Sequence, residues 1–216
     1  NGRDAFRDVS VVIVTLNGRR HLERCLRALA EQRGVEFETI LVDNASTDDS
    51  VSFVREAFPR ARVVAETRNL GFAGGNNSGF RASSRPYVAF LNNDTEPAPD
   101  WLLALRRAFD ARPWAGFVTS RLVYMHDRSI IDSAGDGLTR AGGAYKRGHG
   151  QPADRFLLSC EVFGACGAAF MIRREVFEEL GGFDEDFFLS HEDVDLSYRA
   201  RLRGYRCWYA ADAVVA

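Results

Sequence analysis

The strongest constraint on the fold is the alternation of strand-like and helix-like segments through the first half of the chain. The first segment, Val9–Thr15, is an almost continuous run of apolar and β-branched residues, typical of a strand buried on both faces of a parallel sheet. From Leu22, apolar residues recur at i, i+3, i+4 and i+7, which is the pattern of a helix with one buried face. The alternation predicts an α/β, doubly wound, mainly parallel sheet with a ligand crevice at the carboxyl ends of its strands. Three further strands are predicted at Phe37–Val42, Ala61–Ala65 and Tyr87–Leu91.

The second half of the chain is less regular. A helix is predicted from Trp101 and a strand over Gly116–Tyr124, whereas Arg128–Arg155 is glycine-rich and has no clear period. Apolar residues alternate after Glu192 as they would in a strand. Acidic residues at the start of this segment, arginines near its end and Gly204 just beyond nevertheless favour a helix, because they match the polarity of both helix termini.

Length and composition fit one globular domain. The 216 residues are 46% hydrophobic and 27% charged, which is close to the average of folded proteins and far from the composition of disordered ones. No linker, internal repeat or low-complexity tract divides the chain. We therefore expect a single domain over residues 1–216, with a first half at 1–97 and a second half at 98–216 that elaborates the same fold.

Charge and cysteine content exclude several classes of protein. The 28 basic and 30 acidic side chains leave a net charge of -2, so there is no overall positive field to hold a nucleic acid. The N-terminus lacks the apolar core of a signal peptide, and the apolar stretch Val162–Ile172 is too short to cross a bilayer. The cysteines form no CxxC pair and lie mostly among apolar neighbours, which predicts buried thiols in a reducing, cytoplasmic compartment. These cysteines are Cys25, Cys160, Cys166 and Cys207.

Polar residues lie at the ends of the predicted strands. Thr15 and Asn17 lie at the end of the first strand, and Asp43 follows the second. Because the carboxyl ends of parallel strands share one edge of the sheet, we expect these side chains to converge. A carboxylate such as Asp43 can accept the imide N–H of a pyrimidine base, while the other two offer donors and acceptors beside it. The alternative is that Asp43 only caps the next turn.

A stretch rich in glycine and asparagine, RNLGFAGGNN at residues 68–77, leads into a predicted helix. Glycines let backbone N–H groups approach an anion closely, and a helix N-terminus adds favourable partial charge, so a diphosphate fits this chemistry. The stretch matches neither GxGxxG nor the P-loop pattern GxxxxGK[ST], and it follows the third strand instead of the first. A dinucleotide site of the Rossmann type is therefore disfavoured.

The loop Asn92-Asn93-Asp94 follows the fourth strand and carries oxygen-bearing side chains at alternate positions. Mg²⁺ and Mn²⁺ prefer oxygen ligands, and Mg²⁺ often takes only one or two carboxylates together with substrate phosphates. Asp94 is therefore a candidate metal ligand. A simple turn is the alternative reading of this loop.

The segment His191–Asp195 places three carboxylates within four residues. On a helix, Glu192 and Asp195 lie near one face while Asp193 points elsewhere. A carboxylate beside an acceptor hydroxyl is suited to act as a general base. The alternative is that these residues only provide favourable charge at a helix N-terminus. We interpret the single histidine, His191, as accessory or structural.

Taken in order, five segments resemble successive motifs of the inverting family 2 glycosyltransferases with the GT-A fold, particularly the rhamnosyltransferase-like branch. The segments are VSVVIVTLN, LVDNASTDDS, RNLGFAGGNN, YVAFLNNDTEP and GGFDEDFFLSHEDVDLSYRARLRGYR. The resemblance covers nearly the whole chain. It implies a metal-dependent hexosyltransferase in which residues 1–97 bind a nucleotide sugar and residues 98–216 bind the acceptor and carry the catalytic groups.

The resemblance also implies roles for individual residues. Asp94 would bind the divalent cation, Mg²⁺ or Mn²⁺, Asp193 would be the catalytic base, and Glu192 would lie near the acceptor. The nucleoside would be held by Thr15, Asn17 and Asp43, and the diphosphate would lie near Asn69, Gly71 and Asn76. These six residues and Asn92 are called the donor group.

The chain departs from the family pattern at two places. Members often have Asp-x-Asp where this chain has Asn92-Asn93-Asp94. Members also commonly carry a metal-ligating histidine after the strand that follows the last helix, where this chain ends with Ala213–Ala216. On the basis of the resemblance, we expect the chain to be truncated at its carboxyl end.

The implied reaction is transfer of a sugar, with inversion, from dTDP-rhamnose or a UDP-sugar to a hydroxyl of a polysaccharide or lipid-linked acceptor. A lipid-linked acceptor would bring the enzyme to the inner face of the membrane through contacts made outside this chain. One alternative is a catalytically silent module that binds nucleotide sugars or carbohydrate, which Asn92 permits. Another is a sugar nucleotidyltransferase, which lacks support because no lysine-rich glycine loop lies near the first strand. The sequence leaves the oligomeric state open.

Overall fold

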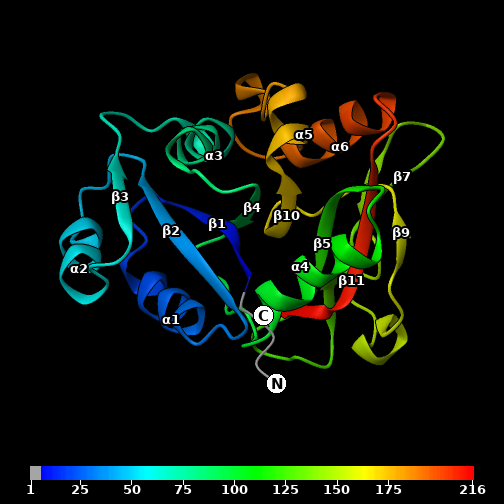
Figure 1. Ribbon diagram of the computed structural model, residues 1–216, viewed down its shortest axis with the longest axis horizontal. Coiled ribbons are helices and arrows are strands. Elements are labelled where there is room, and N and C mark those ends of the chain that lie inside the picture. The colour runs from blue at the N-terminus through cyan, green and yellow to red at the C-terminus, as the bar shows by residue number, and fades with distance from the viewer. Residues whose placement is uncertain (1–5) are drawn as a thin grey trace.

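The computed structural model describes residues 6–216 as a central β-sheet with helices packed on both faces (Figure 1). The strands are β1 Phe6–Thr15, β2 Val35–Asp43, β3 Arg62–Ala65, β4 Tyr87–Leu91, β5 Ala115–Val123, β6 Ile131–Ser133, β7 Asp136–Leu138, β8 Ala144–Lys146, β9 Cys160–Val162, β10 Ala169–Arg173 and β11 Arg206–Val215. The α-helices are α1 Arg19–Ala30, α2 Ser50–Ala57, α3 Gly71–Ala82, α4 Trp101–Ala111, α5 Arg174–Glu179 and α6 Glu192–Leu202. Two 3₁₀-helices are η1 Ala153–Phe156 and η2 Glu185–Phe187.

The main sheet is mixed and runs β3-β2-β1-β4-β10-β5-β11-β9, with β6 paired to β5 beside this path. Strands β3, β2, β1 and β4 are mutually parallel, as are β5 and β11. Strand β10 lies between β4 and β5 and is antiparallel to both. The predicted α/β class and mainly parallel sheet are confirmed. The sequence pattern did not indicate the antiparallel insertion of β10, because its pairing partners lie far away along the chain.

The apolar residues form two core clusters, one on each face of the sheet. Helices α1 and α4 cover one face, where Leu22 and Trp101 are fully buried. Helices α3, α5 and α6 cover the other face, where Phe90, Phe177 and Phe183 pack against one another with ring centroids 5.1 to 5.3 Å apart. Figure 1 shows the same two helix layers on opposite sides of the sheet. The carboxyl ends of the parallel strands are left free between these layers, which is where a ligand site is expected.

The glycine-rich stretch forms the body of helix α3, whereas the sequence predicted a loop that leads into a helix. A Cβ atom on Gly79 would lie 2.3 Å from Cγ1 of Val12, and one on Gly75 would lie 2.7 Å from Cγ1 of Val14. Such contacts are far too short for real atoms, so only glycine lets α3 pack this closely on β1. These two glycines therefore serve helix–sheet packing; Gly75 belongs to the stretch 68–77 and Gly79 lies just beyond it. The diphosphate role of the stretch stays a prediction.

The predicted helix after residue 191 is confirmed as α6. Leu196 and Ala200, four residues apart, are buried against the sheet, whereas Tyr198 and Leu202 are exposed. The apolar residues that alternate as in a strand are therefore not all buried. Burial follows the four-residue spacing of a helix. Gly204 has a φ of +86° just beyond the helix, as expected for a residue that ends it.

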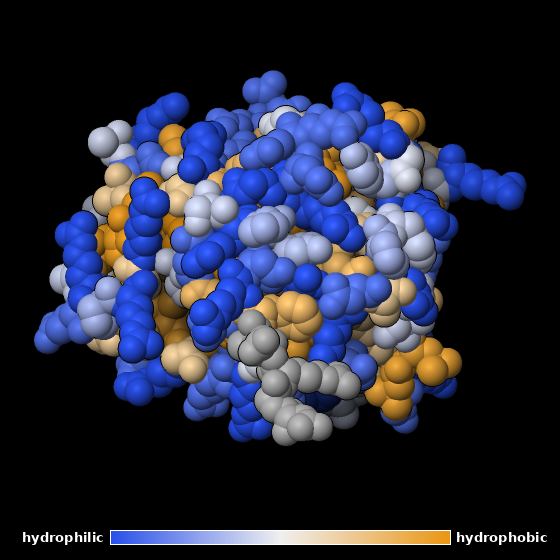
Figure 2. All heavy atoms as spheres, viewed as in Figure 1, coloured by the Kyte–Doolittle hydropathy of each residue, from blue (hydrophilic) through white to orange (hydrophobic). Residues whose placement is uncertain are grey.

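The viewed surface is largely hydrophilic, with small hydrophobic patches between charged side chains (Figure 2). Within residues 6–216, the structure has no helix with the length and apolar character needed to span a membrane. The prediction of buried thiols holds for Cys25, Cys166 and Cys207, while Cys160 is only partly buried, and all four cysteines are free.

Candidate active site

The ends of β1 and β2 bring Thr15 and Asp43 side by side, because these residues are register partners in the sheet. Oδ2 of the buried Asp43 accepts a hydrogen bond from the backbone N–H of Ser46 at 3.1 Å. Its Oδ1 is also buried and has no partner among residues 6–216. Asp43 therefore caps the following turn and still presents an acceptor, so the two interpretations of this residue are compatible.

Asn17 joins the end of β1 to the loop that follows β2. Its backbone has a φ of +50°, in the left-handed region. Its Oδ1 accepts hydrogen bonds from the backbone N–H groups of Thr47 at 2.8 Å and Asp48 at 3.3 Å. Its own N–H donates to Oγ of Ser46 at 2.8 Å. The position of Asn17 supports a role in shaping the loop beside Asp43.

The N-terminus of α3 is already occupied by a protein group. The backbone carbonyl of Phe188 accepts hydrogen bonds from the N–H groups of Phe72 at 2.7 Å and Ala73 at 3.3 Å. Oδ1 of Asn69 accepts from the N–H of Gly71 at 2.9 Å. A diphosphate that used the helix amides would therefore have to displace the chain at Phe188.

Asn76 is buried inside α3, and its Nδ2 donates to the carbonyl of Phe72 at 3.0 Å. This hydrogen bond closes within the helix, four residues back. The placement favours a packing role over the diphosphate contact that the resemblance implied. Gly71 has a φ of +73°, and a Cβ on it would lie 2.4 Å from the Phe188 carbonyl oxygen, so glycine is required for that contact.

The loop before β10 contacts both the end of β4 and the start of α6. The N–H of Asn92 donates to the carbonyl of Ala168 at 2.9 Å. The N–H of Gly167 donates to Oδ2 of Asp193 at 2.7 Å. A Cβ on Gly167 would lie 3.0 Å from that same Oδ2, so the glycine permits the close approach. The backbone amide therefore fixes the direction of the Asp193 carboxylate.

Asn92, Glu192 and Asp193 line a common cavity of 390 Å³, which we call the acidic pocket. Glu192 is 4% exposed, and its Oε2 is buried and unpaired within the described part of the chain. Burial raises the pKa of Glu192 to about 7, and the negative charge of Asp193 adds to the rise. The pocket thus holds two adjacent carboxyl groups in different environments, the arrangement that separates acid and base roles.

A third carboxyl group, Asp136 on β7, lines the acidic pocket and was not singled out in the sequence. It is 6% exposed, and its Oδ1 is buried without a partner in the residues described. Burial raises the pKa of Asp136 to about 7, and the charge of Asp193 is the next contribution. No local signal marks Asp136, because it lies in the segment without clear period.

The remaining predicted residue, Asp94, lies just after β4 and is exposed. It lines neither the acidic pocket nor the Asp43 loop. Across the described residues, no group of three or more His, Cys, Asp or Glu side chains is arranged to hold a metal ion. The sequence-predicted residues therefore lie around Asp43 at the strand ends, at the start of α3 and around Asp193, with Asp94 just after β4.

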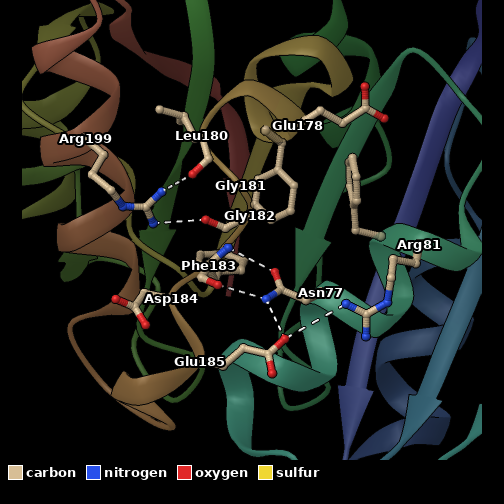
Figure 3. Close-up of a pocket in the computed structure, with 12 residues that line it drawn as sticks. Asn77, Arg81, Glu178, Leu180, Gly181, Gly182, Phe183, Asp184, Glu185 and Arg199 are labelled. Carbon is tan, nitrogen blue, oxygen red and sulfur yellow. Dashed lines mark hydrogen bonds and ion pairs between the residues drawn. The ribbon is translucent and has the colours of Figure 1, made fainter.

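A larger cavity of 640 Å³ lies behind the segment that leads to α6 and contains none of these predicted residues (Figure 3). Nδ2 of Asn77 donates to the carbonyl of Phe183 at 2.8 Å and to Glu185 at 3.0 Å. Arg199 donates to the carbonyls of Leu180 and Gly182 at 2.6 and 2.9 Å. These contacts hold the Gly-Gly-Phe-Asp turn between α5 and η2, which lines this cavity.

The mixed, mostly parallel sheet with helices on both faces matches the fold of solved GT-A glycosyltransferases. Residues 10–181 match the family described as Glycosyl transferase family 2. The chain belongs to that family.

The chain is also similar to individual proteins. An N-acetylglucosaminyl-diphospho-decaprenol L-rhamnosyltransferase of Mycobacterium tuberculosis is 28% identical over 95% of this chain and 74% of its own length. The uncharacterized protein y4gI of Sinorhizobium fredii is 33% identical over 91% of this chain, which spans only 23% of y4gI. The mannosyltransferase PcManGT of Pyrobaculum calidifontis, solved with GDP-Man and Mn²⁺, superimposes with a TM-score of 0.72 and 25% identity over 96% of this chain and 56% of that one.

Proposed function

We propose that the chain transfers a sugar from a nucleoside-diphosphate sugar to an acceptor hydroxyl with inversion at the anomeric carbon. The acceptor oxygen forms the new bond to the anomeric carbon while the bond to the diphosphate breaks. The diphosphate leaves with that electron pair, and the hydroxyl proton passes to a carboxylate. Similarity to the L-rhamnosyltransferase favours dTDP-rhamnose as the donor and a lipid-linked saccharide as the acceptor. A UDP-sugar is the alternative donor.

Asp193 is the proposed base because its carboxylate is fixed in direction and borders the acidic pocket. The Gly167 amide holds Oδ2 at 2.7 Å, and the carboxylate borders a cavity that also reaches the end of β4. A base must be held in place beside the proton that it accepts. Burial raises the pKa of Glu192, so this group stays protonated to a higher pH than an ordinary carboxyl group and can donate a hydrogen bond to the acceptor.

Asp43 is the proposed reader of the nucleoside. Its buried, unpartnered Oδ1 supports this role, because a buried acceptor without a partner costs free energy unless a ligand completes it. The pyrimidine of a dTDP or UDP donor supplies a matching imide N–H. Asn17 and Thr15 hold the surrounding loop and strand ends in place.

Asp94 is the proposed ligand of Mg²⁺ or Mn²⁺. The residue is exposed at the strand end and forms no hydrogen bond or ion pair with the rest of residues 6–216, so its carboxylate is available. One carboxylate fits a hard cation that takes its other ligands from the diphosphate and water. Bound there, the cation would offset negative charge on the leaving diphosphate.

The donor can be tested by thermal shift with UDP-sugars, dTDP-rhamnose and GDP-mannose, each with and without Mn²⁺. A ligand that binds only the folded chain raises the melting temperature, and we expect the rise to need Mn²⁺. If no nucleotide sugar stabilises the protein, the proposed function is wrong. Binding without any turnover of donor would instead identify a silent binding module.

The base can be tested with Asp193→Asn against a matched control, Asp195→Asn. Both changes remove one negative charge from the first turn of α6, but Asp195 pairs with Arg199 at 2.6 Å and does not line the pocket. We expect turnover to fall by roughly 10²- to 10⁴-fold in Asp193→Asn and to stay near wild type in the control. Near-normal turnover in Asp193→Asn, with donor binding retained, would remove it as the base.

A further inference from the structure

The hairpin of β7 and β8 forms one wall of the acidic pocket, and its backbone is tied to the loop that orients Asp193. The N–H of Asp136 donates to the carbonyl of Gly164 at 2.9 Å, and the N–H of Gly164 donates back to Asp136 at 3.2 Å. Across the hairpin, Asp136 is the register partner of Lys146. Asp136 is therefore held from two sides, and its carboxyl group is a fixed feature of the pocket wall.

One oxygen of the Asp136 carboxyl group has no hydrogen-bond partner among the described residues. Its Oδ1 is buried, with no hydrogen-bond donor supplied by residues 6–216. Lys146, its register partner, directs its Nζ to Asp132 at 2.8 Å instead. Leaving a buried acceptor unpaired costs about 1 to 3 kcal/mol in a typical protein. A ligand hydroxyl that donates to Oδ1 would recover this free energy.

An aromatic side chain lies on the same wall. Tyr145 is 53% exposed and lines the acidic pocket. A Cβ on its register partner Gly137 would lie 2.3 Å from Cζ of the Tyr145 ring, so the ring packs directly over the glycine backbone. One face of the ring is thereby supported while much of the side chain remains open to solvent. A flat, half-exposed aromatic beside a hydrogen-bonding group can contact both the apolar and the polar parts of one ligand.

We infer that Asp136 and Tyr145 form a subsite for a saccharide unit of the acceptor. In this subsite Oδ1 of Asp136 accepts a hydrogen bond from a hydroxyl next to the reacting one, and the Tyr145 ring contacts the C–H face of the sugar. The inference deepens the proposed function, on which it rests, by naming the acceptor as one whose reactive end is a sugar with a second free hydroxyl. The reacting hydroxyl then lies toward Asp193, across the same 390 Å³ pocket.

The subsite can be tested by direct binding, without knowledge of the natural acceptor. Octyl glycosides of glucose, N-acetylglucosamine, galactose, mannose and rhamnose are titrated by saturation-transfer NMR into protein loaded with UDP and Mg²⁺, which is diamagnetic. We expect wild type to bind at least one glycoside. At pH 8, where the Asp136 carboxyl group is ionised, the affinity should fall roughly 10- to 100-fold in Asp136→Ala, because a hydrogen bond to a charged group is lost. Asp136→Asn, which keeps an acceptor oxygen of the same size, should recover part of it.

Two further variants separate a binding role from a folding defect. Tyr145→Phe keeps the ring and should bind like wild type, whereas Tyr145→Ala should weaken binding. Asp154→Asn, an exposed aspartate outside the pocket, is the control for charge and should change nothing. The melting-temperature rise with the stabilising nucleotide and Mn²⁺ should be the same in all variants, because none of these residues lies in the donor group.

The outcomes distinguish the subsite from the proposed function. Unchanged glycoside affinity in Asp136→Ala would overturn the subsite. Wild type that binds no glycoside would also overturn it. In either case, a nucleotide- and Mn²⁺-dependent rise in melting temperature would leave the proposed function standing, whereas its absence would remove both.

Discussion

The buried Asp136 carboxyl group makes the stability of the folded chain depend on pH, and Asp136→Asn should remove the share of that dependence that Asp136 contributes. Burial raises the pKa from 3.8 to about 7 in the folded protein, with Asp193 and Asp132 adding to the rise and Lys146 opposing it. Between these two values the unfolded chain has released a proton that the folded chain still holds. The stability present below pH 3.8 is therefore lost progressively as the pH rises toward 7.

The size of the effect follows from the pKa difference. Each unit corresponds to 1.36 kcal/mol, so a rise of about three units destabilises the folded state by about 4 kcal/mol at pH 8. At pH 5 the same arithmetic leaves about 1.5 kcal/mol, because the folded group is still protonated and pH 5 lies only about one unit above the unfolded pKa of 3.8. Asparagine has the same shape and no charge. Relative to wild type, Asp136→Asn should gain these amounts.

The assay is urea unfolding of wild type, Asp136→Asn and the exposed control Asp154→Asn at pH 5, 6, 7 and 8. The stability advantage of Asp136→Asn should grow by about 2.5 kcal/mol from pH 5 to pH 8, or roughly 5 to 10 °C in melting temperature for a chain of this size. The control should show no such trend. An advantage that is constant with pH, or a variant less stable than wild type at pH 8, would refute the reasoning.

Two other substitutions test the packing. Gly79→Ala should destabilise the fold by about 1 to 3 kcal/mol, because the clash with Val12 outweighs the gain of about 1 kcal/mol in helix propensity. Gly143→Ala, in the β7–β8 turn, is the control and should be nearly neutral. Equal urea midpoints for the two variants would contradict this prediction. Arg106→Ala should cost about 3 to 5 kcal/mol, because its largely buried guanidinium pairs with Asp8 at 2.8 Å. Arg7→Ala breaks an exposed pair and should cost less than about 1 kcal/mol, so a similar loss in both arginine variants would argue against the role of burial.

Local patterns were sufficient to predict the strands β1 to β4 and the helices α1 and α6. Each of these elements carries its own periodicity or end signals within a short window, as the buried pair Leu196 and Ala200 and the terminal Gly204 do for α6. The glycines of the stretch 68–77 were harder to interpret for the opposite reason. Gly75 looks like a loop residue in isolation, and only the proximity of β1 explains why the helix needs it.

For the site residues, the sequence predicted the identity of the side chains but not their surroundings. Asp43 and Asp193 follow recognisable segments, so the sequence identified them as candidates, but it did not indicate which groups contact them. The buried Oδ1 of Asp43 and the Gly167 amide on Asp193 arise from contacts between distant segments. The Phe188 carbonyl at the start of α3 is a contact of the same kind, and it changes what that helix N-terminus can offer a ligand.

By itself, therefore, the sequence determined the alternating α/β architecture, the order of its motifs and the acidic residues that follow them, because these depend on short-range periodicity and residue type. Only the tertiary structure decided which carboxyl groups meet. Asp136 joins Glu192 and Asp193 because β7 is bridged to the loop before β10, a pairing across residues 136 and 164 that leaves no trace in either segment. Burial, and with it the raised pKa of Asp136, is a property of that assembly and not of the residue.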